Sequence, residues 1–307
     1  MTREQYFSNL LPPRGKINAV IDTDTFNEVD DQFALAYLLS LTDRVDVKAI
    51  YAAPFHNERS TGAEDGMEKS YSEIMKVLDS GGFDFDRECV FKGSRAFMES
   101  EDTPVPSDAC EDLAQRAMRY SPENPLYVVA IAAITDIASA ILKNPAIAEN
   151  IVVVWLGGHS IHECDNREFN MRQDIAAARV VFGCGVPLVQ LPCRGVVSSF
   201  LTTGPELEYW LRGKNPLCDY LLDAVIDEVV PRVPAGAAWS RVIWDVTAVG
   251  WLINDDNRLM SWHLEHSPIP EYDHRYAFDN RRHFIASVDG IHRDALYTDL
   301  FRRLTKA

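Results

Sequence analysis

The chain has 307 residues, of which 47% are hydrophobic and 25% charged, and this balance is typical of a globular protein with a large core. Acidic side chains outnumber basic ones by 46 to 30, and the net charge of −16 argues against binding to nucleic acid or to anionic membranes. Neither a transmembrane segment nor a signal peptide is visible. The six cysteines form no C-x-x-C pair, which argues against a zinc site, and we expect a cytoplasmic protein with reduced thiols.

Apolar runs alternate with helical patterns over the first 200 residues, which predicts a mostly parallel sheet flanked by helices. Strands are predicted at 17–21, 45–53, 89–91, 126–132, 151–156 and 187–191. Helices are predicted near residue 30 and at 67–78, 111–120, 135–143 and 174–182, the fourth capped by Thr135 or Asp136. The remaining residues predict helices at 205–211, 217–229, 240–253 and 294–304, with strand-like segments at 259–264 and 283–288. We expect one α/β domain over residues 1–307, open and Rossmann-like, with extra helices in its C-terminal third.

Four aspartates follow the first predicted strand within ten residues: Asp22, Asp24, Asp30 and Asp31. In an open α/β sheet, ligands bind where strands end in loops of this kind. Crowded carboxylates raise one another's pKa unless a cation is present, and Ca²⁺ or Mg²⁺ is the natural compensation. The simpler interpretation is that these are turn and helix-start residues, which explains one or two aspartates but not four.

A second pattern lies in the loop after the strand at 151–156, where Glu168 and Asn170 flank Phe169. If this segment is extended, the two polar side chains share a face, because side chains alternate along a strand. A carboxylate and an amide on one face could hold the hydroxyls of a sugar. The alternative interpretation is a solvated loop.

The third pattern is the pair Trp244 and Asp245, which the apolar spacing places inside the predicted helix at 240–253. An aspartate among apolar residues is costly to bury without a partner, so Asp245 either faces solvent or binds something. The tryptophan beside it is more typical of a core position. The pair gains functional meaning if it meets the aspartate cluster in space.

The acidic stretch resembles the signature of the nucleoside hydrolases, the inosine–uridine-preferring type of N-ribohydrolase. Asp22-Thr23-Asp24 matches the family's Asp-x-Asp element, and the segment DDQFAL from Asp30 matches its DDxxAL helix start. The resemblance extends along most of the chain, through Asn57, AITDIASAI, LGGH, REFN and Trp244-Asp245. It implies a nucleoside hydrolase-like fold and an enzyme that cleaves ribonucleosides into base and ribose, as in purine salvage.

The resemblance also implies roles for individual residues. A Ca²⁺ ion is expected on the carboxylates of Asp24, Asp31 and Asp245 and the backbone carbonyl of Ile131. Asp24 is the expected general base toward the attacking water. The residues expected to contact the ribose are Asp30, Asn57, Glu168 and Asn170. The family suggests a homo-oligomer, a dimer or a tetramer, with a small-molecule nucleoside as the partner.

Two departures from the family pattern affect this interpretation. The loop from Thr25 to Val29 reads TFNEV, without the family's Pro-Gly turn, and Asn27 could adopt the left-handed conformation in place of glycine. Many members carry a histidine, a proposed general acid, where this chain has Trp244, which resembles the purine-preferring branch whose aromatic residue stacks on the base. The base could then be protonated by solvent, with Trp244 stacking on it as a catalytic contact, or by a nearby histidine: His56, His159 or His162.

Two alternatives come from other classes of protein. The segment VIDTDT also fits the first motif of haloacid-dehalogenase-type phosphatases, with Asp22 as nucleophile and Asp24 as acid and base. The later acidic motif of that family has no convincing match. The other alternative is a calcium-stabilised protein of the same fold that binds a nucleoside or sugar and is not an enzyme. Its ligand would raise the melting temperature without yielding product.

Overall fold

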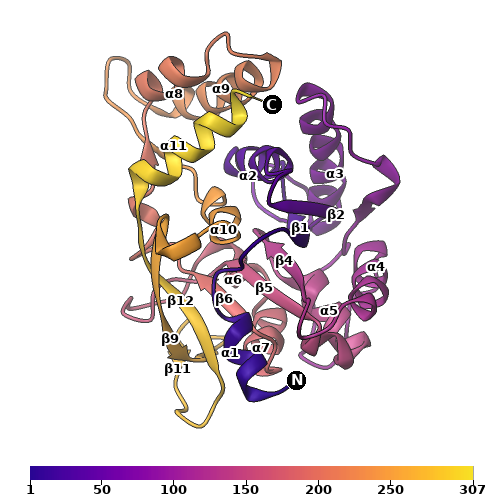
Figure 1. Ribbon diagram of the computed structural model, residues 1–307. Coiled ribbons are helices and arrows are strands. Elements are labelled where there is room, and N and C mark those ends of the chain that lie inside the picture. The colour runs from indigo at the N-terminus through magenta and orange to yellow at the C-terminus, as the bar shows by residue number, and fades with distance from the viewer. Residues whose placement is uncertain (307) are drawn as a thin grey trace.

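The computed structural model describes residues 1–306 and is built around an eight-stranded sheet (Figure 1). Its strands are β1 (Ile17–Thr23), β2 (Val45–Ala52), β3 (Val90–Lys92), β4 (Leu126–Ala130), β5 (Ile151–Leu156), β6 (Leu188–Leu191), β9 (Met260–His266) and β12 (Phe284–Ile291). They lie in the order β3-β2-β1-β4-β5-β6-β12-β9, and every neighbouring pair is parallel except β12 and β9. The predicted α/β class and mostly parallel sheet are therefore confirmed.

The strand order places a crevice beside β1. The chain runs outward from β1 to β2 and β3, then returns to β4 on the other side and continues to β5 and β6. Loops that leave β1 and β4 therefore diverge, which makes this a topological switch point where open α/β sheets bind ligands. The two strand ends lie side by side, since Ile131 N–H donates to the carbonyl of Asp22 at 2.9 Å.

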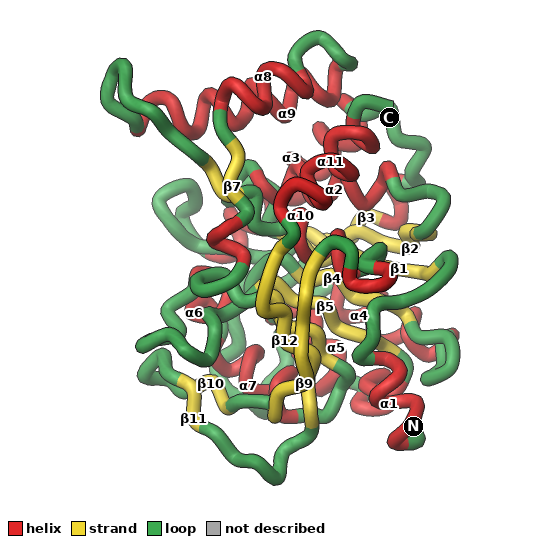
Figure 2. Tube along the Cα trace, turned by 60° about the vertical axis from the view of Figure 1, so that its left-hand side comes forward, coloured by secondary structure: helices red, strands yellow, loops and turns green. Residues whose placement is uncertain are grey.

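Helices cover both faces of the sheet (Figure 1). One face carries α2 (Asp30–Ser40), α3 (Ala63–Ser80), α10 (Val246–Trp251) and α11 (Arg293–Leu304), and the other carries α4 (Asp108–Arg116), α5 (Thr135–Lys143) and α7 (Ile175–Gly183). Each face has its own hydrophobic cluster, and neighbouring residues of β1 alternate between them, Val20 in one and Ile21 in the other. In the C-terminal third, α8 (Gly204–Leu211) and α9 (Pro216–Val229) pack beyond α11 (Figure 2).

Several short elements complete the described chain. They are α1 (Arg3–Asn9), α6 (Phe169–Gln173), β7 (Leu201–Thr202), β8 (Arg241–Val242), β10 (Ile269–Pro270) and β11 (Tyr276–Ala277). β10 pairs with β11, and β7 pairs with β8, each antiparallel. Within residues 1–306, no helix is both long enough and apolar enough to pass through a lipid bilayer.

Three local predictions were wrong. The helix predicted at 240–253 begins only at Val246, because the preceding residues pair as a strand with β7. Neither Thr135 nor Asp136 caps α5, since the first donates to Asp174 at 2.7 Å and the second accepts from Ser94 and Ser107. Asn27 is not among the described non-glycine residues with a positive φ, so the longer loop turns without a left-handed residue there.

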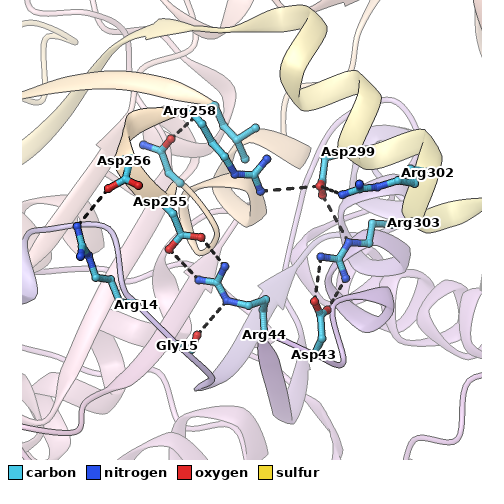
Figure 3. A network of polar contacts seen from close by, with 12 residues as sticks. Arg14, Gly15, Asp43, Arg44, Asp255, Asp256, Arg258, Asp299, Arg302 and Arg303 are labelled. Carbon is cyan, nitrogen blue, oxygen red and sulfur yellow. Dashed lines mark hydrogen bonds and ion pairs between the residues drawn. The ribbon is translucent and has the colours of Figure 1, made fainter.

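The buried carboxylate of Asp299 ties α11 to α2. The hydroxyl of Tyr37 donates to Asp299 Oδ2 at 2.6 Å, and Arg302 donates to Oδ1 at 2.8 Å. Arg303 and Arg258 lie 3.6 and 3.8 Å away, so three arginines surround one carboxylate (Figure 3). Tyr37 is fully buried, and its hydroxyl therefore depends on this acceptor.

We expect Asp299→Ala to lower the free energy of unfolding by about 2 kcal/mol, because the hydroxyl of Tyr37 stays buried without an acceptor. Urea denaturation measures this loss. Asp294→Ala is the matched control, since it removes a carboxylate that is 92% exposed on the same helix, and it should cost less than about 1 kcal/mol. Equal losses in the two variants would contradict the role given to Asp299.

Candidate active site

A cavity of about 320 Å³ opens where β1, β4, β5 and β6 end in loops. Of the metal and substrate contacts that the family resemblance implies, all but Asn57 line it: these are Asp24, Asp30, Asp31, Ile131, Glu168, Asn170, Trp244 and Asp245. Asn57 does not line the cavity itself. Its Nδ2 donates to Asn27 Oδ1 at 2.6 Å, and Asn27 does line the cavity. Segments from the beginning, the middle and the last third of the chain thus converge on one hollow.

Acidic side chains form one wall of the cavity. Asp30, Asp31 and Asp245 each offer a carboxylate oxygen within 4.8 Å of the other two. The carboxyl of Asp31 also contacts that of Asp24, whose two oxygens are buried without a hydrogen-bond donor. Asp245 reaches this wall because it directly precedes α10, which packs against the aspartate-bearing helix α2.

The acidic wall brings together buried carboxylates that repel one another. Burial raises the pKa of Asp24, Asp31 and Asp245 well above its usual value, and repulsion from neighbouring carboxylates raises it further. A set of buried carboxylate oxygens without donors is the environment that a hard divalent cation neutralises. The unpartnered oxygens of Asp24 therefore fit a metal ligand, and the arrangement can hold a divalent ion.

Asp30 differs from the other three because it has a cationic partner. Arg241 Nη2 lies 3.4 Å from Asp30 Oδ1, and the same nitrogen lies 2.8 Å from Glu28 and 3.2 Å from Glu228. Burial raises the pKa of Asp30 to about 7, although Arg241 opposes this shift. Asp30 belongs to the group of three carboxylates whose oxygens lie closest together, and it shares the charge of Arg241 with Glu28 and Glu228.

The expected extended face of Glu168 and Asn170 is wrong, since the helix α6 begins directly after Glu168. The carboxylate of Glu168 caps this helix, accepting from the N–H groups of Asn170 at 2.9 Å and Met171 at 2.8 Å, and also from that of Gly158 at 2.9 Å. Asn170 Nδ2 donates to the carbonyl of Leu156 at 3.0 Å. Both side chains are thereby fixed while still lining the cavity.

A model of the inosine-uridine preferring nucleoside hydrolases matches residues 19–279. The chain belongs to this family. Its members are metal-dependent glycosidases that act on N-glycosyl bonds, so the predicted enzyme class and the hydrolysis of ribonucleosides are confirmed. Asp22, the nucleophile of the phosphatase alternative, is fully buried and does not line the cavity, which removes the local support for that alternative.

Solved structures of nucleoside hydrolases share the fold. A plant nucleoside hydrolase, PpNRh1, is 17% identical with a TM-score of 0.75, and the match covers 96% of this chain and 100% of that one. A purine-preferring ribonucleoside hydrolase from Gardnerella vaginalis is 19% identical, with a TM-score of 0.73 and 94% and 98% coverage. An inosine-uridine preferring enzyme from Bacillus anthracis is 16% identical, with a TM-score of 0.68 and 95% and 100% coverage. No curated protein matches the sequence.

Of the three histidines considered as proton donors in this nucleoside hydrolase, only His159 lines the cavity. Its Nδ1 accepts the backbone N–H of Arg194 at 3.2 Å, which leaves the proton of the neutral ring on Nε2. Burial lowers the pKa of His159, and Nε2 is buried without a hydrogen-bond partner. His56 and His162 are exposed and lie outside the cavity lining.

The sequence analysis missed two cationic residues of the site, Arg167 and Arg194. Arg167 precedes the Glu-Phe-Asn triplet, and Arg194 follows β6. No spacing in the sequence links them, since they belong to loops of neighbouring strands that meet only in the folded protein. The only signal in the sequence is that Arg167 stands directly before the Glu-Phe-Asn triplet, and Arg194 has no such neighbour.

Proposed function

We propose that the chain hydrolyses the N-glycosidic bond of ribonucleosides with the help of Ca²⁺ and prefers purine bases. The observation that carries this proposal is the convergence of Asp24, Asp31 and Asp245 on one wall of the cavity, beside Ile131. Carboxylate and carbonyl oxygens are the donors that Ca²⁺ prefers. Bound by these residues, the ion would lower the pKa of a water molecule and offer coordination sites to ribose hydroxyls.

The side chains of the cavity divide the remaining work. Asp24 accepts a proton from the attacking water while the water oxygen bonds to C1′ and the C1′–N bond breaks, its electron pair passing to the base. Asp30, Glu168 and Asn170 hold the ribose hydroxyls, which fixes the sugar as positive charge develops on its ring. Asn57 contributes through Asn27, whose side chain it holds at the cavity.

Trp244 supports the proposed purine preference. Its side chain lines the cavity and also packs against the hydrophobic cluster that includes α10, so the ring has a fixed place in the wall. A purine presents more surface to an aromatic ring than a pyrimidine does. We propose that the base stacks on Trp244 and takes its proton from solvent, or from His159 if that side chain moves.

We expect Trp244→Ala to lower kcat/KM for inosine by about 10- to 100-fold, the value of one base–aromatic stack. The loss for uridine should be several-fold smaller, because a pyrimidine stacks less. Steady-state ribose release from both nucleosides measures the difference. Trp210→Ala, which removes a 40% exposed tryptophan that does not line the cavity, is the control. Equal losses for inosine and uridine would contradict the stacking role.

The test of the whole proposal is a panel of purine and pyrimidine nucleosides, analysed for free base and ribose with and without a chelator. Product from purines that is lost with the chelator and restored by Ca²⁺ is the expected result. Ligand-dependent melting shifts without any product would instead favour the non-catalytic binding protein. Family resemblance further supports a cytoplasmic homodimer or homotetramer that serves purine salvage, and light scattering on the purified protein tests the assembly.

A further inference from the structure

Arg167 and Arg194 give the cavity a cationic side opposite in charge to its acidic wall. Both come from the loops that follow β5 and β6, whereas the aspartates come from the end of β1, from α2 and from the start of α10. The chain has a net charge of −16, so a pair of cations inside this cavity runs against the overall balance. The acidic wall does not neutralise them, because within residues 1–306 its ion pair is formed with Arg241.

Arg167 is free to bind a ligand. Its side chain is exposed and takes part in none of the ion pairs or side-chain hydrogen bonds found among residues 1–306. Arg172, which lies five residues further on, is occupied differently, with its guanidinium 5.2 Å from the centre of the Phe169 ring. A guanidinium without a carboxylate partner at a binding site matches the geometry of a carboxylate or phosphate group.

Arg194 is only loosely held. Its Nη1 lies 3.6 Å from both Glu163 and Asp165, which is beyond hydrogen-bond distance, and its side chain is 47% exposed. Glu163 and Asp165 do not line the cavity, whereas Glu168 does, and its carboxylate already accepts three backbone N–H groups, which offset its charge. From inside the cavity, an anionic group could therefore approach both arginines past a carboxylate whose charge is already offset.

The position of the anion on the substrate follows from the proposed function, on which this inference rests. The 2′- and 3′-hydroxyls face the acidic wall and C1′ carries the base, so C5′ is the ribose carbon left to bear another group. Arg167 directly precedes Glu168, a proposed sugar contact, and both line the cavity, so we assign Arg167 to the sugar side. We propose that the preferred substrate carries a phosphate on C5′ that Arg167 and Arg194 bind, that is, a nucleoside 5′-monophosphate.

The reaction is the same hydrolysis with a charged sugar. The water oxygen bonds to C1′, the C1′–N bond breaks with its electrons going to the base nitrogen, and that nitrogen gains a proton. The products are the free base and ribose 5-phosphate, and no oxidant, reductant or second substrate is needed. The phosphate stays attached to C5′ throughout and serves only to bind.

The test compares inosine 5′-monophosphate with inosine on the full chain in the presence of Ca²⁺. Wild type should show a kcat/KM at least about 10-fold higher for the monophosphate, the value of a charge-assisted contact. Arg167→Gln and Arg194→Gln should each remove about 10-fold of that preference and leave inosine unchanged within about twofold. Arg172→Gln removes the same charge from α6 outside the cavity lining and should change neither substrate.

A binding assay separates the inference from the proposed function. Ribose 5-phosphate should raise the melting temperature more than ribose or inorganic phosphate does, and Arg167→Gln should remove that excess. If inosine is cleaved and its monophosphate is not, the inference falls while the proposed function stands. If no substrate is cleaved, the proposed function falls and the melting shifts alone decide the inference. Equal stabilisation by inorganic phosphate, or a preference for nucleosides with an anionic base such as orotidine, would overturn it.

Discussion

Asp24→Asn is expected to lower kcat/KM for inosine by about 1,000-fold or more, because one substitution removes the proposed general base and a negatively charged metal ligand. Steady-state kinetics at saturating Ca²⁺ measures the loss. Asn keeps the size of the side chain, so the cavity should keep its shape. The effect should be larger than that of any other single substitution considered for this protein.

The stability of Asp24→Asn shows whether the variant is still folded. In chelator, Asp24→Asn should be at least as stable as wild type, since it removes the repulsion between the carboxylate of Asp24 and those of Asp31 and Asp245. Asp46→Asn, which changes an exposed carboxylate paired with Lys48 on β2, should alter neither activity nor stability by a measurable amount. Near-wild-type ribose release by Asp24→Asn would refute the assignment of the base.

Removing divalent cations is expected to reduce ribose release by at least about 100-fold and to lower the melting temperature. The second effect follows because an ion that binds only the folded state stabilises it by about 2.7 kcal/mol when its concentration is 100 times its dissociation constant. Readdition of Ca²⁺ should restore both. Scanning calorimetry and the ribose assay, run on the same dialysed sample, measure the two effects.

Asp245→Asn provides the matched variant for metal removal. It should lose most of the Ca²⁺-dependent melting shift, because Asp245 is the one proposed ligand that comes from the C-terminal third of the chain, at the start of α10. Asp255→Asn, on a surface carboxylate paired with Arg44, should keep the full shift. Full activity in the presence of the chelator would rule out a catalytic metal.

The buried strands were predictable from local sequence alone. The apolar run at 151–156 is β5 (Ile151–Leu156) to the residue, because a strand covered on both faces is apolar throughout. The start of α2 at Asp30 was predictable from the aspartate pair followed by helically spaced apolar residues. The meeting of Asp24 and Asp245 was expected only through the family resemblance, since no local pattern links positions so far apart.

The errors share a physical cause, which is contact between distant segments. Residues 241–242 look helical by spacing, but pairing with β7 makes them a strand. Thr135 has a side chain that could cap a helix, but its hydroxyl donates to the carboxylate of Asp174 instead. Arg241 gave no signal in the sequence, because its role as the partner of Asp30 depends on β8 lying beside the start of α2 in the folded protein. Arg167 and Arg194 were missed for the same reason.

The most direct test of the account is a crystal structure of the protein soaked with Ca²⁺ and ribose. The account predicts one ion bound by the side chains of Asp24, Asp31 and Asp245 and the carbonyl oxygen of Ile131, with two ribose hydroxyls completing its coordination. An ion bound elsewhere, or ribose bound to the cavity with no ion beside Asp24, would contradict it.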